Sequence, residues 1–407
     1  MSIRLYANAH VDPGTCIYCG QVDTFTDEHV FPAGLGGDDR QYLLKNLVCG
    51  TCNTKVFSPL ELQLMRNSPF ALARLYQQPT GRGKGSKAQP PEFTADRCEM
   101  TDPETGIVSE AEFTTGGAPR SLPQIQVFGN EFHLSGPDSE RIEGFLAGLG
   151  TLLGDTVNVI RKVRADETVS FEVTTYDWEQ DIYLRSGASG EPKPPNGIWL
   201  EALAGSDGQA VGWPRLFQRS RGQYVARVVR EDDTALFLAQ TRKALSTLQN
   251  VKLPGPTAIN RPSIHVGMAV LYQQVFRAMA KIGMNFACYE YGAEVVRSHS
   301  FDHIRNIILT GSEAVPLTTM SDQMQQMFQR EARQVHLGLL YPVAVGESSH
   351  SVIFLIRLYG GGMHAFLLTE DALLPPACSP AVLVVYYLEH RVERHTLKDY
   401  VHSMLHS

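Results

Sequence analysis

The spacing of apolar residues predicts a chain in which helices and strands are mixed. Two short helices are expected to begin at Ser58-Pro59 and Ser68-Pro69, because each pair offers a capping hydroxyl followed by proline at the first helical position. Farther along, helical spacing predicts helices over 139–154 and 233–249, and alternation predicts a hairpin over 157–176 and a strand over 223–230.

The last third of the chain has the clearest pattern. Helices are expected over 266–288, 300–310 and 321–333, and the second of them ends before Gly311. Four strand-like segments follow, at 338–345, 351–359, 363–368 and 381–388. Three consecutive glycines at 360–362 predict a hairpin turn between the second and third of these strands. The whole pattern is typical of an α+β fold.

One segment predicts a domain boundary. The residues at 80–91, TGRGKGSKAQPP, are rich in Gly, Pro and Lys, as is typical of an exposed linker. With 407 residues, the chain is long enough for two or three domains. We therefore expect a small N-terminal domain over 1–79, the linker at 80–91, an α+β middle domain over 92–256 and an α+β C-terminal domain over 257–407.

Composition excludes several classes of protein. No run approaches the ~18 to 20 apolar residues of a membrane helix, and the first twenty residues lack the basic cap and apolar core of a signal peptide. We therefore expect a cytoplasmic protein without a membrane partner. The net charge of −7 argues against a protein that coats nucleic acid over its whole surface.

Basic residues are nevertheless concentrated in one part of the chain. Between residues 40 and 91, eight Lys or Arg residues stand against the single acid Glu61. Since this segment carries +7 and the whole chain −7, the remaining residues carry −14. The segment predicts one surface that faces a polyanion, with a solvated face and a flexible linker as the alternative. The candidate nucleic-acid contacts are Lys45, Lys55, Arg66, Arg82, Lys84 and Lys87.

Four of the seven cysteines form a pattern. Cys16 and Cys19 make one Cys-x-x-Cys pair, and Cys49 and Cys52 make a second. Because a cytoplasmic compartment keeps thiols reduced and Zn²⁺ favours four thiolates, the two pairs predict a structural zinc site rather than disulfides. The alternative is a thioredoxin-like redox pair, which expects one Cys-x-x-Cys opening a helix after a buried strand.

The residues between the two cysteine pairs add a second pattern. They read Thr26-Asp-Glu-His-Val-Phe-Pro32, then glycines at 34, 36 and 37, then Lys45-Asn-Leu-Val48, and Asn53 follows the last cysteine directly. With these elements in this order, the segment from about Cys16 to Arg74 resembles an HNH endonuclease of the ββα-metal type, in the zinc-stapled four-cysteine subfamily.

The resemblance implies a role for each matching residue. His29 would be the general base of phosphodiester hydrolysis, which suits a side chain whose ordinary pKa is near 6.5. Asn46 would tie the loop between the two strands. Glu28 and Asn53 would ligate a catalytic Mg²⁺ or Mn²⁺, since oxygen ligands favour these ions. The four cysteines would hold Zn²⁺ in place of a larger apolar core.

These features predict a metal-dependent DNA endonuclease or nickase whose C-terminal region regulates or targets cutting. The resemblance suggests bacterial anti-phage defence as the setting, with other proteins of such a system as partners. One alternative is a non-catalytic zinc-containing DNA-binding or assembly subunit, and another is a nuclease switched on by a nucleotide messenger. The sequence leaves open the choice between DNA and RNA, nicking or double-strand cleavage, and the oligomeric state.

Overall fold

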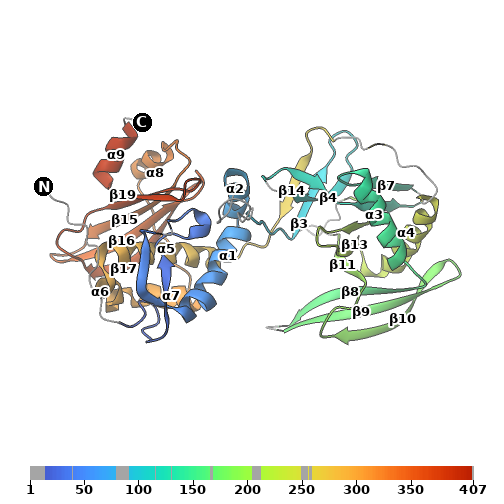
Figure 1. Ribbon diagram of the computed structural model, residues 1–407, viewed down its shortest axis with the longest axis horizontal. Coiled ribbons are helices and arrows are strands. Elements are labelled where there is room, and N and C mark those ends of the chain that lie inside the picture. Colours follow the sequence, from blue (N-terminus) through green and yellow to red (C-terminus); the bar gives the residue numbers. More distant parts are fainter. Residues whose placement is uncertain are drawn as a thin grey trace. The chain divides into compact units, whose positions relative to one another are not determined.

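The computed structural model describes residues 14–38, 40–78, 91–114, 116–129, 131–165, 168–203, 212–248, 255 and 259–405. Contacts between residues divide the chain into two compact units (Figure 1). The first unit contains 1–94 and 268–407, and the second contains 95–267. The second unit is thus inserted into the chain of the first.

The first unit begins with two strands and a helix. Strand β1 (Phe25–His29) pairs antiparallel with β2 (Leu43–Cys49), and the short 3₁₀ helix η1 (Ala33–Leu35) lies between them. The π-helix η2 (Cys52–Phe57) continues without a break into α1 (Ser58–Arg66), and α2 (Pro69–Gln77) follows. The predicted start of α2 is confirmed, because the Ser68 hydroxyl accepts a hydrogen bond from the Ala71 N–H.

The rest of the first unit consists of helices and an antiparallel sheet. The helices are α5 (Tyr272–Tyr291), α6 (Ala293–Arg297), α7 (Asp302–Thr310), α8 (Asp322–Gln329) and α9 (Leu397–Leu405), with a 3₁₀ turn η5 (His299–Phe301) before α7. The strands are β15 (His336–Ala344), β16 (Ser349–Arg357), β17 (Met363–Leu373), β18 (Ala381–Tyr386) and β19 (Arg391–Thr396). Their order in the sheet is β17-β16-β15-β18-β19.

This sheet separates two apolar layers, because successive strand residues point to opposite faces. In β18, Val382 and Val384 belong to the core beneath α8 and α9, whereas Leu383 and Val385 belong to the core that contains α5. Figure 1 shows α8 and α9 on one side of the sheet and α5 on the other. The core on the α5 side also includes the apolar residues of β1, β2 and α1.

This shared core differs from the predicted domain boundaries, which place 1–79 and 257–407 in separate domains. Instead, Val48 and Leu60 of the N-terminal part belong to the same buried cluster as Met284 and Phe354. The physical reason is that the N-terminal segment buries its apolar residues against α5 and the C-terminal sheet instead of enclosing a separate core. The N-terminal part therefore folds onto the C-terminal part.

The described residues of the second unit form a larger mixed sheet, the helices α3 (Ser139–Leu152) and α4 (Thr234–Leu248), and a 3₁₀ turn η4 (Glu231–Asp233). The sheet has the order β10-β9-β8-β11-β13-β12-β6-β7. Its strands are β6 (Gln124–Phe128), β7 (Glu131–Ser135), β8 (Thr156–Ala165), β9 (Thr168–Glu179), β10 (Ile182–Glu191), β11 (Ile198–Ala202), β12 (Arg215–Gln218) and β13 (Tyr224–Val228). A smaller sheet contains β3 (Arg97–Thr101), β4 (Val108–Phe113), β5 (Pro119–Ser121) and β14 (Ser263–Gly267).

A buried network of charges connects these two sheets. The Arg215 side chain is fully buried and forms ion pairs with Glu99 and Glu110, and Arg227 pairs with Glu110 and Glu201. Buried charges of this kind require partners, because an unpaired charge in a core costs several kcal/mol. The sequence pattern gave no sign of this network.

The predicted α+β class is confirmed, and most predicted elements lie within a few residues of the observed ones. The helix predicted over 266–288 begins later, at Tyr272, because residues 263–267 pair with β3 as strand β14. Strands β3 to β7, β10 to β12 and β19 were not predicted, nor were helices α6 and α9. The predicted linker lies outside the described residues except for Pro91. No helix among the described residues is long and apolar enough to cross a membrane.

Candidate functional site

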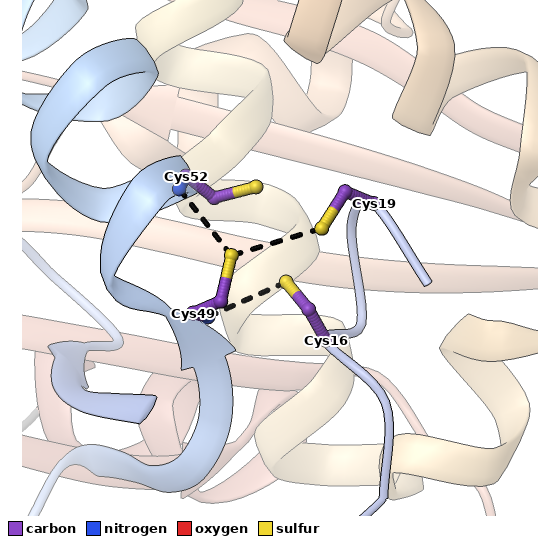
Figure 2. Close-up of side chains that lie close together, drawn as sticks. All are labelled: Cys16, Cys19, Cys49 and Cys52. Carbon is purple, nitrogen blue, oxygen red and sulfur yellow. Dashed lines mark hydrogen bonds between the residues drawn. The ribbon is translucent and has the colours of Figure 1, made fainter. Parts of the chain in front are cut away.

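The four paired cysteines converge from three parts of the N-terminal segment. Cys16 and Cys19 lie in the loop before β1, Cys49 ends β2, and Cys52 begins η2. Their sulfur atoms all lie within 4.8 Å of one another, and the Sγ atoms of Cys19 and Cys49 are 3.7 Å apart (Figure 2). Four thiolates bound to Zn²⁺ at about 2.3 Å in a tetrahedron have sulfurs about 3.8 Å apart. The spacing therefore fits a zinc ion.

Backbone amides also point toward this cluster. The Cys49 N–H donates to Sγ of Cys16, and the Cys52 N–H donates to Sγ of Cys49, each over 3.4 Å (Figure 2). Four sulfurs at this spacing, with backbone N–H donors directed at two of them, suit a structural zinc ion better than a redox pair, which needs only two cysteines.

Three residues have unusual backbone requirements here, namely Gly36 and Gly37 in the connection between β1 and β2, and Asn46 within β2. Gly36 has a φ of +89°, and a Cβ added there would lie 2.4 Å from Cα of Tyr387. A Cβ at Gly37 would lie 2.0 Å from the Phe31 carbonyl oxygen. Asn46 has a φ of +58° within β2, and asparagine tolerates this left-handed conformation better than most residues. These conformations support a structural role for Asn46.

His29 is the last residue of β1. It is half-buried and lies opposite Leu43 of β2. Its backbone carbonyl accepts a hydrogen bond of 2.8 Å from Nδ2 of Asn285, which lies in α5. The backbone of His29 is thus held by a residue from the C-terminal part of the chain.

Glu28 points into the core instead of toward solvent. Its side chain is buried and forms an ion pair with Nζ of Lys281 in α5. The same ammonium lies 2.6 Å from Oε1 of Glu61 in α1 and 5.3 Å from the centre of the Phe57 ring. Lys281 is only 1% exposed. Burial alone lowers the pKa of Lys281, but the two carboxylates outweigh burial and raise it, so the ammonium keeps its charge.

Asn285 connects the buried acid to the histidine strand. Its Nδ2 donates to Oε1 of Glu28 over 3.0 Å and to the His29 carbonyl. Its Oδ1 accepts a hydrogen bond of 2.6 Å from the Tyr18 hydroxyl. The Glu28 carboxylate and the His29 carbonyl can only accept hydrogen bonds, and the Tyr18 hydroxyl donates one. The Asn285 amide must therefore turn its NH₂ toward Glu28 and His29 and its oxygen toward Tyr18.

Lys281 and Asn285 were missed by sequence reasoning. They lie in a helix that was predicted from its apolar residues alone. Within 278–288 they are the strongly polar residues of an otherwise apolar run, and they are four residues apart on one helical face. That spacing is the signal that predicts a buried polar contact on this face, although it does not identify the partner.

Asn53 lies on η2, across from β1. Its Nδ2 donates to Oγ1 of Thr26 over 3.0 Å, so its amide oxygen is the atom that remains to accept a hydrogen bond or to bind a cation. Of the two residues predicted to ligate Mg²⁺ or Mn²⁺, Asn53 therefore has a suitable oxygen. Glu28 is in a different situation, because its Oε1 is already paired with the Lys281 ammonium and accepts a hydrogen bond from Asn285 within the core.

The basic residues predicted to contact nucleic acid differ in their environments. Lys45 and Lys55 are exposed. Arg66 forms an ion pair of 2.8 Å with Glu92. Arg74, which contributes to the basic segment, is buried, and burial lowers its pKa. Arg82, Lys84 and Lys87 lie outside the described residues.

Comparison with known proteins gives a family match in the N-terminal part of the chain. Residues 16–68 match the family model of the HNH endonucleases, and this range includes both cysteine pairs, β1, β2, η2 and α1. No curated protein and no solved structure matches the chain at a significant level. The ββα segment at residues 16–68 is therefore an HNH endonuclease domain with a four-cysteine cluster suited to zinc.

Proposed function

We propose that this protein is an endonuclease that hydrolyses phosphodiester bonds in DNA, with His29 as the general base. The family match at residues 16–68 carries this proposal, because it coincides with the ββα segment in which His29 ends β1. The proposal assigns the chemistry to the first unit. The second unit and the rest of the first unit are then available to regulate or target cutting, as the sequence predicts.

The reaction requires one proton acceptor close to the scissile phosphate. Neutral imidazole takes a proton from water, the resulting hydroxide attacks phosphorus, and the bond from phosphorus to the leaving sugar oxygen breaks. That oxygen then receives a proton from solvent. A positioned general base typically contributes a factor of roughly 10² to 10⁴ to the rate. His29 is suited to this task because hydrogen bonding from Asn285 holds its backbone while its side chain remains half-buried.

The zinc ion and the catalytic metal ion have different sites and different roles in this proposal. Cys16, Cys19, Cys49 and Cys52 would hold a structural zinc ion, which supplies folding free energy rather than reactivity. Dependence on Mg²⁺ or Mn²⁺ stays a prediction from the family resemblance, with Asn53 as the oxygen ligand that fits. A setting in anti-phage defence and activation by a nucleotide messenger also stay predictions.

Supercoiled plasmid provides the direct assay. We expect the full-length protein to convert it to open circles in Mg²⁺ or Mn²⁺ and to stop when a chelator removes the ion. One active site that cuts one strand produces open circles before linear DNA. Plasmid that stays supercoiled under all these conditions would contradict the proposal.

A second candidate function is a zinc-containing module that binds DNA without cutting it. One observation favours it, namely that the carboxylate of Glu28, the predicted metal ligand, is paired with Lys281 in the core. A gel-shift assay on the same plasmid fragments separates the two functions. Binding with no open circles at any metal concentration would support the second function and exclude the first.

The exposed lysines offer a test of the nucleic-acid surface. If Lys45 and Lys55 each contact a phosphate, the double alanine variant should flatten the dependence of log K on log salt by about 2 units, because each contact releases condensed counterions. Affinity should fall by similar factors on unrelated sequences, since phosphate contacts do not read bases. Fluorescence anisotropy over a salt series measures this slope. An unchanged slope would show that these lysines only solvate the surface.

A further inference from the structure

The positively charged partner of Glu28 is a side chain of the protein, Lys281, and not a metal ion. A carboxylate that is 4% exposed needs a positive partner, and in this structure the partner is the Lys281 ammonium. Glu61 supplies a second carboxylate to the same ammonium, and Phe57 supplies an aromatic face. The ammonium is therefore paired with two carboxylates and lies beside an aromatic ring, all from the HNH domain.

The lysine and the asparagine act on the same strand. Lys281 and Asn285 lie one turn apart on α5, and both contact Glu28. Asn285 also reaches the carbonyl of His29, the next residue along β1. Two consecutive residues of β1, the buried acid and the histidine, are thus fixed by one face of a helix that lies some 250 positions later in the chain.

The HNH domain by itself does not contain these contacts. Residues 16–68, the part that matches the family, supply Glu28, Glu61 and Tyr18, whereas the cation that pairs with both acids among the described residues comes from α5. Without α5, Glu28 would lose both its ion pair and its hydrogen bond. The domain is therefore complete only together with α5.

We propose that Lys281 takes the place of a divalent cation as the partner of Glu28, and that Lys281 and Asn285 are positioning residues for His29. This inference rests on the proposed nuclease function for its effect on rate. Its structural part, the pairing of Glu28 with Lys281, is independent of cutting. The buried acid then serves to anchor the histidine strand on α5.

A double-variant cycle tests the pairing. Lys281→Met alone leaves two carboxylates without their cation in a buried site, whereas Glu28→Gln with Lys281→Met removes one of those charges. We expect the double variant to have a higher melting temperature than Lys281→Met alone, because residues in direct contact are energetically coupled. Additive effects in thermal unfolding would overturn the pairing. Should Lys281→Met fail to fold, recovery of folding in the double variant supports the pairing, and its absence counts against it.

Manganese binding tests whether Glu28 is a metal ligand. Electron paramagnetic resonance counts bound Mn²⁺ in wild-type protein and in Glu28→Gln, and needs no cutting activity. We expect the two affinities to agree within about two-fold, since the carboxylate is committed to Lys281. A loss of ten-fold or more in Glu28→Gln would overturn the proposal and make Glu28 a ligand.

A rate measurement tests the positioning role. Asn285→Ala should lower the maximal single-turnover rate of nicking by ten-fold or more and leave the half-saturating DNA concentration unchanged, because it moves His29 without touching DNA. The matched control is Arg277→Ala on the same helix, whose guanidinium donates to the carbonyls of Ile308 and Leu309 away from the site. We expect the control to retain the wild-type rate.

The two proposals fail in different ways. An Asn285→Ala protein that cuts at the wild-type rate would overturn the positioning role while leaving the nuclease function intact. A wild-type protein that does not cut would overturn the nuclease function and, with it, the positioning role. The unfolding cycle and the manganese titration would still decide the pairing of Glu28 with Lys281.

Discussion

Replacing His29 with alanine is expected to lower the rate of plasmid nicking by roughly 10² to 10⁴-fold, the contribution of a positioned general base. Zinc content and thermal unfolding should be unchanged, because the side chain is half-buried and the contact from Asn285 is to the backbone. DNA affinity should also be retained. Single-turnover nicking, elemental analysis and a gel-shift assay measure these quantities.

His303→Ala provides a matched control for that variant. His303 is exposed on α7 and makes no contact with the HNH segment among the interactions found in the described residues. We expect this control to cut at the wild-type rate. If His29→Ala lost DNA binding and cutting together, His29 would have a role in holding the substrate instead of accepting a proton.

Replacing Cys49 with serine is expected to release the zinc ion and to destabilise the whole first unit. Cys49 is buried in the same core as α5 and the C-terminal sheet, so the loss is not confined to the N-terminal segment. A structural zinc ion contributes several kcal/mol or more to folding. Since ~1 kcal/mol shifts the melting temperature of a unit of 150–250 residues by about 2–4 °C, we expect a fall of at least about 10 °C.

Cys378→Ser is the control for this variant, because Cys378 lies in the same unit but outside the four-cysteine cluster. Elemental analysis should find zinc in the control and none in Cys49→Ser. The sequence-based boundaries predict a different result, in which residues 257–407 keep a separate transition. Such a separate transition, or unchanged zinc content, would contradict the shared core or the zinc site respectively.

The parts of the site that could be predicted from sequence are those encoded by neighbouring residues. Two Cys-x-x-Cys pairs, His29 at the end of a strand and the glycines at 36 and 37 each have a local reason, namely ligand geometry, strand position or backbone conformation. For such features, the residue types and their spacing within a short segment are enough to predict the local structure. All of them lie within residues 16–68, the segment that matches the family.

The parts that could not be predicted depend on contacts between distant residues. The ion pair between Glu28 and Lys281 joins positions more than 250 residues apart, and an apolar helix pattern does not indicate which partner a buried lysine will meet. The two-unit division has the same origin. Strand β14 pairs with β3, so the second unit extends to residue 267, whereas the predicted middle domain ends at residue 256.

Metal ligation shows where a family resemblance and a particular chain diverge. The motif position of Glu28 implies a ligand, but the surrounding residues decide whether its carboxylate is accessible. Here α5 supplies both a cation and an amide donor, and the carboxylate is directed into the core. Asn53, which has no such partner on its amide oxygen among the hydrogen bonds found in the described chain, remains compatible with the implied role.

Chemical rescue of the His29→Ala protein by imidazole tests the central claim most directly. If His29 accepts a proton from the attacking water, imidazole added to the folded, zinc-loaded variant should restore part of the nicking rate. The restored rate should rise with imidazole concentration, and Cys49→Ser should show no such rescue. A His29→Ala protein that nicks plasmid at the wild-type rate without imidazole would contradict the assignment of His29 as the general base.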